Sequence, residues 1–148
     1  MSNYIGITRT NYFSVIDPDR LKNIIAHTES TDDAVELWFN EDKHGHTKYA
    51  FGCTGRICGL TSSYFGIDDS NDDEDSTFND FTDELQKIVS PNDAIIITEV
   101  GFEKMRYASA ISTVITSKKI VDIDLGEEAF NRAADLIGDQ DWDTQMDY

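Results

Sequence analysis

The chain has 148 residues, of which 39% are hydrophobic and 11% aromatic, and its 29 Asp and Glu against 12 Lys and Arg give a formal net charge of −17. This length fits one domain, and the apolar content argues against global disorder. An acidic excess of this size excludes ordinary binding to nucleic acid and disfavours an anionic membrane surface, because both carry negative charge.

The negative charge is concentrated in two segments. Residues 57–86 contain nine acids and no Lys or Arg, and residues 120–148 contain nine acids and one base, whereas the remainder has 11 of each. Because like charges at high density repel, we expect residues 67–77 to form a solvated acidic loop. We expect a single domain over residues 1–138 and an acidic, aromatic tail over residues 139–148.

The first half of the chain predicts strands around one helix. Asp17 and Pro18 are typical of a helix start, and the apolar spacing then predicts a helix as far as about Thr28. A bulge is expected at Gly6. The expected extended segments are residues 3–16, a hairpin made of residues 34–39 and 47–52, and a strand near residues 57–64.

The second half predicts two helices around three strands. The helices are expected over residues 78–89 and 127–137, the second ending at Gly138. Residues 94–125 are rich in β-branched side chains and predict three antiparallel strands, with breaks at Gly101 and at residues 117–119. The sheet side of the hydrophobic core is expected to be formed largely by Ile95, Ile97, Val100, Ile111, Val114 and Ile115.

Hairpin signals and helices with one apolar face together predict an α+β fold. We expect a twisted, mostly antiparallel sheet with about three amphipathic helices on one face.

No catalytic motif is found, so we expect a protein that is not an enzyme. A Gly-rich phosphate loop, a G-x-S-x-G sequence and an H-E-x-x-H sequence are all missing from the chain. Acidic and basic residues near Gly101 are expected to form surface pairs of little energetic value. These residues are Glu99, Glu103, Lys104 and Arg106.

No metal or cofactor is expected either. His44, His46, Cys53 and Cys58 do not have the spacing of a common zinc site. The segment beginning at Asp69 starts like a calcium loop but has Glu74 where that loop needs Gly. The first residues carry no signal-peptide pattern, and two cysteines in such a chain fit reduced thiols, so we expect a cytoplasmic protein.

The acidic residues themselves are the candidate site. On the predicted helices, carboxylates three or four residues apart should form outward-facing rows on a rigid support. Such rows would attract a basic surface evolved for DNA. The expected partner-binding residues are Asp72, Asp73, Glu74, Asp75, Asp80, Asp83, Glu84, Glu127, Glu128 and Asp135. We expect Trp142, Met146 and Tyr148 either to anchor that contact or to pack on their own domain.

Four segments are similar to those of small acidic proteins carried by bacterial conjugative elements, plasmids and phages. They are NYIGITRTNYFSV (3–15), YAFGCTGRI (49–57), TEVGFEKMRYASAISTVIT (98–116) and WDTQMDY (142–148). The resemblance implies an anti-restriction or anti-CRISPR inhibitor, which blocks a host nuclease by covering its DNA-binding surface. The resemblance assigns no functional role to any particular residue of this chain.

Two alternatives stay open at this point. The chain could be a regulatory or structural interaction protein of a mobile element that has no nuclease target. It could also be a small enzyme or metal-binding protein built around the two His and two Cys residues. The inhibitor hypothesis differs from both because it requires ordered rows of exposed carboxylates.

Overall fold

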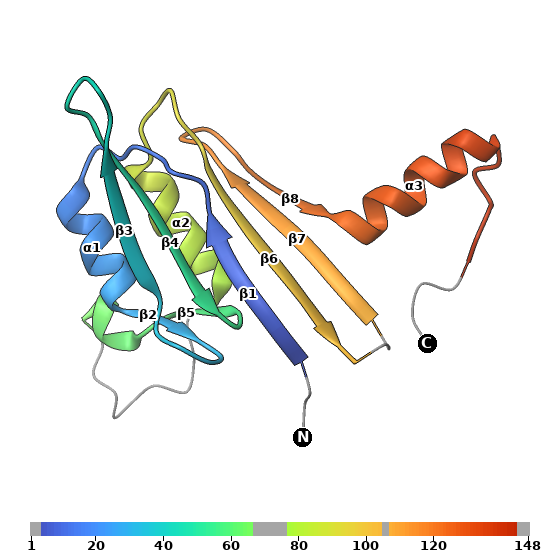
Figure 1. Ribbon diagram of the computed structural model, residues 1–148, viewed down its shortest axis with the longest axis horizontal. Coiled ribbons are helices and arrows are strands. Elements are labelled where there is room, and N and C mark those ends of the chain that lie inside the picture. The colour runs from blue at the N-terminus through green and yellow to red at the C-terminus, as the bar shows by residue number, and fades with distance from the viewer. Residues whose placement is uncertain (1–3, 67–76, 105–106, 145–148) are drawn as a thin grey trace.

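The computed structural model describes residues 4–66, 77–104 and 107–144. Its centre is a six-stranded antiparallel sheet in the order β3-β4-β1-β6-β7-β8 (Figure 1). These strands are β1 (Tyr4–Thr10), β3 (Glu36–Glu41), β4 (Thr47–Thr54), β6 (Ile95–Glu103), β7 (Tyr107–Ile115) and β8 (Ile120–Asp124). The α+β class and the antiparallel sheet predicted from the sequence are therefore confirmed.

A second, two-stranded sheet joins β2 (Thr28–Ser30) to β5 (Ile57–Leu60). Strand β5 is followed by a short 3-10 helix, η1 (Ser62–Phe65). The sequence did not predict β2, because three polar residues after a helix carry no strand periodicity.

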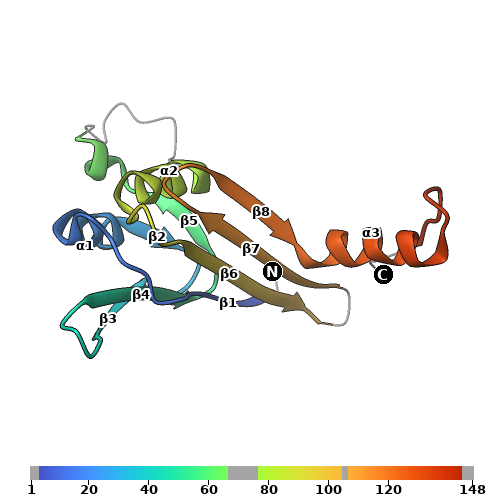
Figure 2. The same ribbon diagram turned by 90° about the horizontal axis from the view of Figure 1, so that it is seen from above.

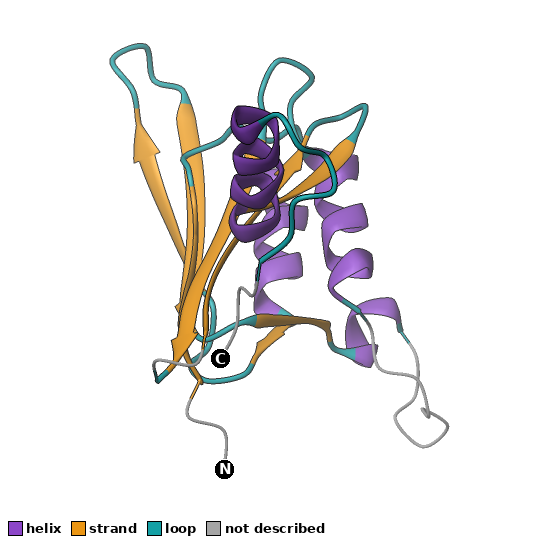
Figure 3. Ribbon diagram, turned by 90° about the vertical axis from the view of Figure 1, so that its right-hand side faces the viewer, coloured by secondary structure: helices purple, strands orange, loops and turns teal. Residues whose placement is uncertain are grey.

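Helices α1 (Pro18–Ala26) and α2 (Phe78–Ile88) cover one face of the large sheet (Figures 2 and 3). Asp17 caps α1 by accepting a hydrogen bond from the backbone N–H of Arg20. Thr77 and Asp80 cap α2 reciprocally, because each side chain accepts a hydrogen bond from the backbone N–H of the other. Both helices therefore begin where the cap residues in the sequence place them.

The core lies between this sheet face and the two helices. Phe51 of β4 is fully buried and meets Phe13 and Phe81 edge to face, at ring-centroid distances of 6.0 and 5.7 Å. The helices supply a buried apolar stripe at helical spacing. Its members are Leu21, Ile24, Ile25, Phe81, Leu85 and Ile88.

Helix α3 (Leu125–Ile137) starts directly after the last residue of the edge strand β8 and extends beyond the sheet (Figure 1). Only Ala134 of this helix is buried. Leu136 is 89% exposed and Ile137 is 57% exposed, so these two apolar side chains of α3 are largely uncovered by the described residues. The predicted end is confirmed, since Gly138 adopts a left-handed conformation with φ of 83°.

The expected break at Gly101 and the expected bulge at Gly6 are both wrong. Gly6 and Gly101 are paired residues in an unbroken register between β1 and β6. Strand β6 continues to Glu103, and the chain then turns at Lys104, which has φ of 49°. A glycine in a strand interior therefore marks no boundary in this protein.

Two expected core residues lie on the other face of the sheet. Ile95 and Ile97 of β6 are buried under the helices, and the two-residue period of a strand places Val100 on the opposite face, where it is 47% exposed. Val114 pairs with Ile96 on that same outer face. The sequence prediction failed here because it counted β-branched residues without applying the alternation along each strand.

Candidate functional site

The most acidic element of the described structure is the segment from Ile120 to Thr144, which we call the acidic arm. It consists of β8, α3 and the turns after α3 (Figure 1). Its only Lys or Arg is Arg132. Its acids are all exposed: Asp122, Asp124, Glu127, Glu128, Asp135, Asp139, Asp141 and Asp143.

One of the arm's carboxylates is paired within the helix. Arg132 Nε lies 3.4 Å from Glu128 Oε1, one turn earlier, and both side chains are more than half exposed. Asp135 accepts a hydrogen bond of 2.9 Å from Gln140, which reaches it from the turn beyond the helix. A single exposed ion pair changes the local charge little, so the arm stays strongly negative.

The tail after α3 also contacts the helix through Trp142. Trp142 is partly buried, and its ring lies 5.3 Å from the ring of Phe130. Packing on its own domain is therefore the observed role of Trp142. Met146 and Tyr148 lie outside the described residues.

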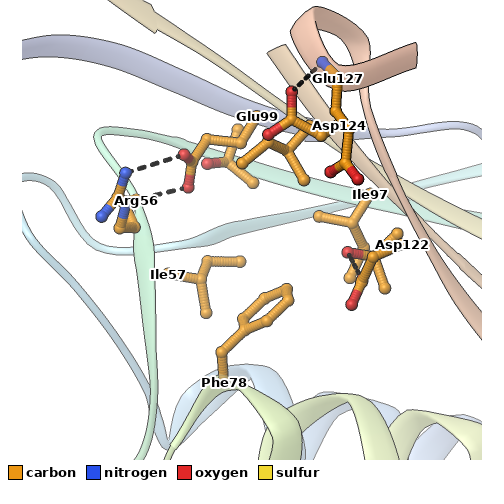
Figure 4. A pocket seen from close by; sticks show the side chains of 11 residues that line it. Arg56, Ile57, Phe78, Ile97, Glu99, Asp122, Asp124 and Glu127 are labelled. Atoms are coloured by element: carbon orange, nitrogen blue, oxygen red, sulfur yellow. Dashed lines mark hydrogen bonds and ion pairs between the residues drawn. The ribbon is translucent and has the colours of Figure 1, made fainter. Parts of the chain in front are cut away.

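A pocket of about 460 Å³ lies at the base of the arm (Figure 4). It is bounded by β5, β6, β7, β8 and the first residues of α2 and α3, and Ile57, Phe78 and Ile97 are among its apolar residues. Four carboxylates and one guanidinium surround this apolar part. They belong to Arg56, Glu99, Asp122, Asp124 and Glu127.

Glu99 and Arg56 form the one ion pair of the pocket that the structure describes. Arg56 donates from Nε and Nη2 to the two carboxylate oxygens of Glu99, both at 3.2 Å. The Glu99 side chain is only 18% exposed, so the expected surface pairing near Gly101 is wrong for this residue. The alternation along β6 could have revealed it, because Glu99 follows the buried Ile95 and Ile97 at two-residue spacing.

Two other pocket carboxylates are held by uncharged donors. Asp122 accepts a hydrogen bond of 2.9 Å from the hydroxyl of Thr113. Asp124 accepts one of 3.2 Å from the backbone N–H of Glu127 and so caps α3. Within the described ranges, Asp122, Asp124 and Glu127 form no ion pair. The pocket therefore has a negative side next to an apolar side.

The acids of α2 do not form the expected outward row. Asp80 and Asp83 are exposed, although Asp80 is also part of the α2 cap. Glu84 is 7% exposed and accepts hydrogen bonds from Arg20, Tyr64 and Lys87, which contradicts its expected role at a surface. Burial alone would raise the pKa of Glu84, but these three donors together lower it to about 2.

Several expected features fall elsewhere in the chain. Asp72, Asp73, Glu74 and Asp75 lie outside the described residues, as does the start of the calcium-like segment. Cys53 is buried in β4 and Cys58 is exposed in β5, whereas the two His residues lie in the β3–β4 turn. Among the described residues, no three His, Cys, Asp or Glu side chains are grouped to hold a metal ion.

Comparisons with known proteins give no relative. No family model, no curated protein and no solved structure matches this chain. The described helices include none with both the length and the apolar character needed to cross a lipid bilayer. The resemblance to mobile-element proteins stays a prediction.

Proposed function

We propose that this protein is a non-enzymatic inhibitor that covers the basic DNA-binding surface of a host defence nuclease of the restriction or CRISPR type. The observation that carries the proposal is the acidic arm, with eight exposed carboxylates and one Arg between Ile120 and Thr144. The nuclease as target follows from the resemblance to mobile-element proteins. The same reasoning places the inhibitor in the cytoplasm of the host bacterium.

The arm's geometry suits a long basic groove. Helix α3 has 13 residues, which corresponds to about 20 Å of length at about 1.5 Å per residue. It continues β8 outward from the sheet, so its polar side is not covered by other described elements (Figures 1 and 2). Carboxylates on a helix and a strand keep fixed spacings, which lets them replace several phosphates at once.

The pocket at the base of the arm suits a single Lys or Arg of the partner. Such a side chain has an apolar stem and a charged end. The stem would contact Ile57, Phe78 and Ile97, and the charged end would lie among Asp122, Asp124 and Glu127. This contact would set the position of the arm on its target, and the remaining acids would supply steering over a Debye length of about 8–10 Å.

The test compares two charge-reversal variants with equal change of charge. The first carries Glu127→Lys, Glu128→Lys and Asp135→Lys on α3. The matched control carries Asp33→Lys, Glu36→Lys and Glu41→Lys, all exposed and located on or next to β3 at the opposite edge of the sheet. We leave Glu84 and Asp80 unchanged, because one is buried and the other caps α2.

Each protein is immobilised and exposed to a bacterial lysate at low salt, and retained nucleases are then assayed for DNA cleavage. We expect the wild type and the β3 control to retain and inhibit a nuclease, with release by added duplex DNA or by raised salt. The α3 variant should neither retain nor inhibit a nuclease. Retention of no nuclease by the wild type, or equal inhibition by the α3 variant, contradicts the proposal.

A second candidate function is a regulatory or structural interaction protein of the mobile element. The observation that favours it is the amount of exposed apolar surface, including Phe39 at 72% and Leu136 at 89% exposure. Such side chains bind protein partners independently of charge. In the lysate experiment, this candidate predicts retention of a protein that is not a nuclease and that raised salt does not release.

A further inference from the structure

The outer face of the large sheet, opposite α1 and α2, has no element over it among the described residues (Figures 2 and 3). Ile5 and Ile7 of β1 are 59% and 57% exposed there, and Phe102 of β6 is 46% exposed. Apolar patches of this kind on a soluble domain usually mark an interaction surface. We call the outward side of β1, β6, β7 and β8 the bare face.

The described side chains of the bare face include no carboxylate, although the chain has 29 Asp and Glu. Strand alternation and the pairing registers assign its side chains. They are Ile5, Ile7, Arg9, Ile96, Thr98, Val100, Phe102, Ala108, Ala110, Ser112, Val114, Val121 and Ile123. Arg9 is the one charged member, and it lies over the ring of Trp38 at 5.3 Å. An occupant of this face would therefore contact mostly apolar side chains and one positive charge, that of Arg9.

The middle of the bare face is made of small side chains. Strand β7 contributes Ala108, Ala110 and Ser112, which are small. Their neighbours across the ladders are larger, with Val100 and Phe102 on β6 and Ile123 on β8. Exposed bases lie in the turns at both ends of β7, where the chain has Lys104 before it and Lys118 and Lys119 after it.

Helix α3 has the properties that this face requires. Leu125, Ala129 and Leu136 lie on one side of the helix and are exposed, Leu136 at 89%. Glu127 lies on the opposite side, and Glu128 and Asp135 lie about a quarter turn away from these apolar residues. An acidic amphipathic helix of about 20 Å thus complements an apolar face with bases at both ends.

The α3 of the same chain cannot cover the face. Strand β8 ends at Asp124 and α3 begins at Leu125, so no residue is left to form a turn back over the sheet. Figure 1 shows the helix leading away from the strand. A connection too short for an intramolecular contact favours the same contact between two copies.

We propose that two copies of this chain form a symmetric dimer in which α3 of each copy packs on the bare face of the other. The contact is reciprocal, as a two-fold axis requires. The acidic side of each α3 stays outward, so the dimer displays two acidic arms. This inference is independent of the nuclease-inhibitor proposal, because it concerns the apolar side of the helix.

The test measures the oligomeric state of the full chain by light scattering and sedimentation over a wide range of concentrations. Leu136→Asp places a charge on the apolar side of α3, and Ile7→Asp places one on the bare face. Asn131→Asp is the matched control, because it adds the same charge to the acidic side of the same helix. All three positions are exposed, so the variants should fold, which thermal unfolding would verify.

We expect a dimer for the wild type and for Asn131→Asp. Leu136→Asp and Ile7→Asp should each raise the dimer dissociation constant by at least about tenfold. Leu136→Ala, which adds no charge, should raise it less. Added salt should strengthen the wild-type dimer, because it screens the repulsion between two chains of charge −17.

Mixing the two disrupted variants identifies the contact. A mixed dimer has one intact contact, between α3 of the Ile7→Asp chain and the bare face of the Leu136→Asp chain. We therefore expect dimer to reappear on mixing and to be weaker than that of the wild type. A wild type that is monomeric at all concentrations, or a Leu136→Asp variant that dimerises like the wild type, would overturn the proposal.

Discussion

Arg20 of α1 donates a hydrogen bond of 2.8 Å to the carboxylate of Glu84 in α2 and so connects the two helices that cover the sheet. Lys87 donates to the other carboxylate oxygen at 2.5 Å, and the hydroxyl of Tyr64 donates to the first at 2.6 Å. The Glu84 side chain is 9% exposed, so these donors replace the water that burial removes. One acid of the acidic segment 57–86 is thus buried between the two helices.

Glu84→Gln should lower the free energy of unfolding by about 2–3 kcal/mol at neutral pH. The pKa of Glu84 is lowered to about 2, so its contribution is fully present above pH 4.5, the ordinary value. It is lost as the pH falls from 4.5 towards 2, because over this range the carboxylate takes up a proton in the unfolded state while it stays ionised in the folded state. Denaturant unfolding at several pH values would measure the difference between the variant and the wild type.

The matched control for this experiment is Asp83→Asn, since Asp83 is the exposed neighbour on the same helix. We expect a change within about 0.5 kcal/mol. A stability difference between Glu84→Gln and the wild type that does not shrink at low pH would contradict the assigned cause.

Asp124→Ala should loosen α3 without unfolding the domain. The Asp124 side chain caps the helix, and loss of such a cap costs about 1 kcal/mol. A helix of 13 residues with one buried side chain has little else to stabilise it. Amide hydrogen exchange in α3 should become about fivefold faster, while exchange in β6 and β7 stays unchanged. Asp124→Ser keeps a capping oxygen and should behave like the wild type, whereas equal acceleration in both variants would show that the cap is not the cause.

Gly52→Ala should destabilise the fold by about 1–3 kcal/mol. A Cβ atom at this position would lie 2.7 Å from the carbonyl oxygen of Thr8 and 3.1 Å from the ring of Trp38. The Trp38 ring can move, but the Thr8 carbonyl belongs to the neighbouring strand β1 and cannot. Thermal unfolding would measure the loss. Thr54→Ala, an exposed site in the same strand, is the control, and equal stability of the two variants would contradict the close approach at Gly52.

The sequence predicted the positions of helices and strands better than the burial and contacts of single residues. Periodicity located both packed helices and most strands within a few residues, and Asp17 and Pro18 marked the start of α1, because these are local properties. Glu84 shows the limit. It lies three residues after Phe81 and four before Ile88, at the border of the apolar stripe, and its partner Arg20 is 64 residues away in the chain. Whether a residue at the border of the stripe is buried or exposed depends on long-range contacts such as Arg20–Glu84, which the local sequence does not reveal.

Helix α3 shows the same limit at the level of packing. Its amphipathic spacing predicts an apolar side that needs a partner. The predicted helix and its predicted end at Gly138 are both found in the structure. The spacing does not say which surface covers that side. The position of α3 depends on its direct connection to β8, so the acidic arm became visible only in the structure.

Raising the ionic strength should stabilise the folded protein. Most described acids are exposed and the net charge is −17, so repulsion between carboxylates lowers stability at low salt. The Debye length falls from about 30 Å at ~0.01 M to about 8 Å at ~0.15 M salt, which screens that repulsion. We expect the melting temperature to rise by about 3–6 °C over this range, equivalent to roughly 1 kcal/mol. The neutral triple variant Glu127→Gln, Glu128→Gln, Asp135→Asn should rise less, since it has fewer charges to screen. A melting temperature that falls with salt would mean that ion pairs such as Arg56–Glu99 and Arg20–Glu84 outweigh the repulsion.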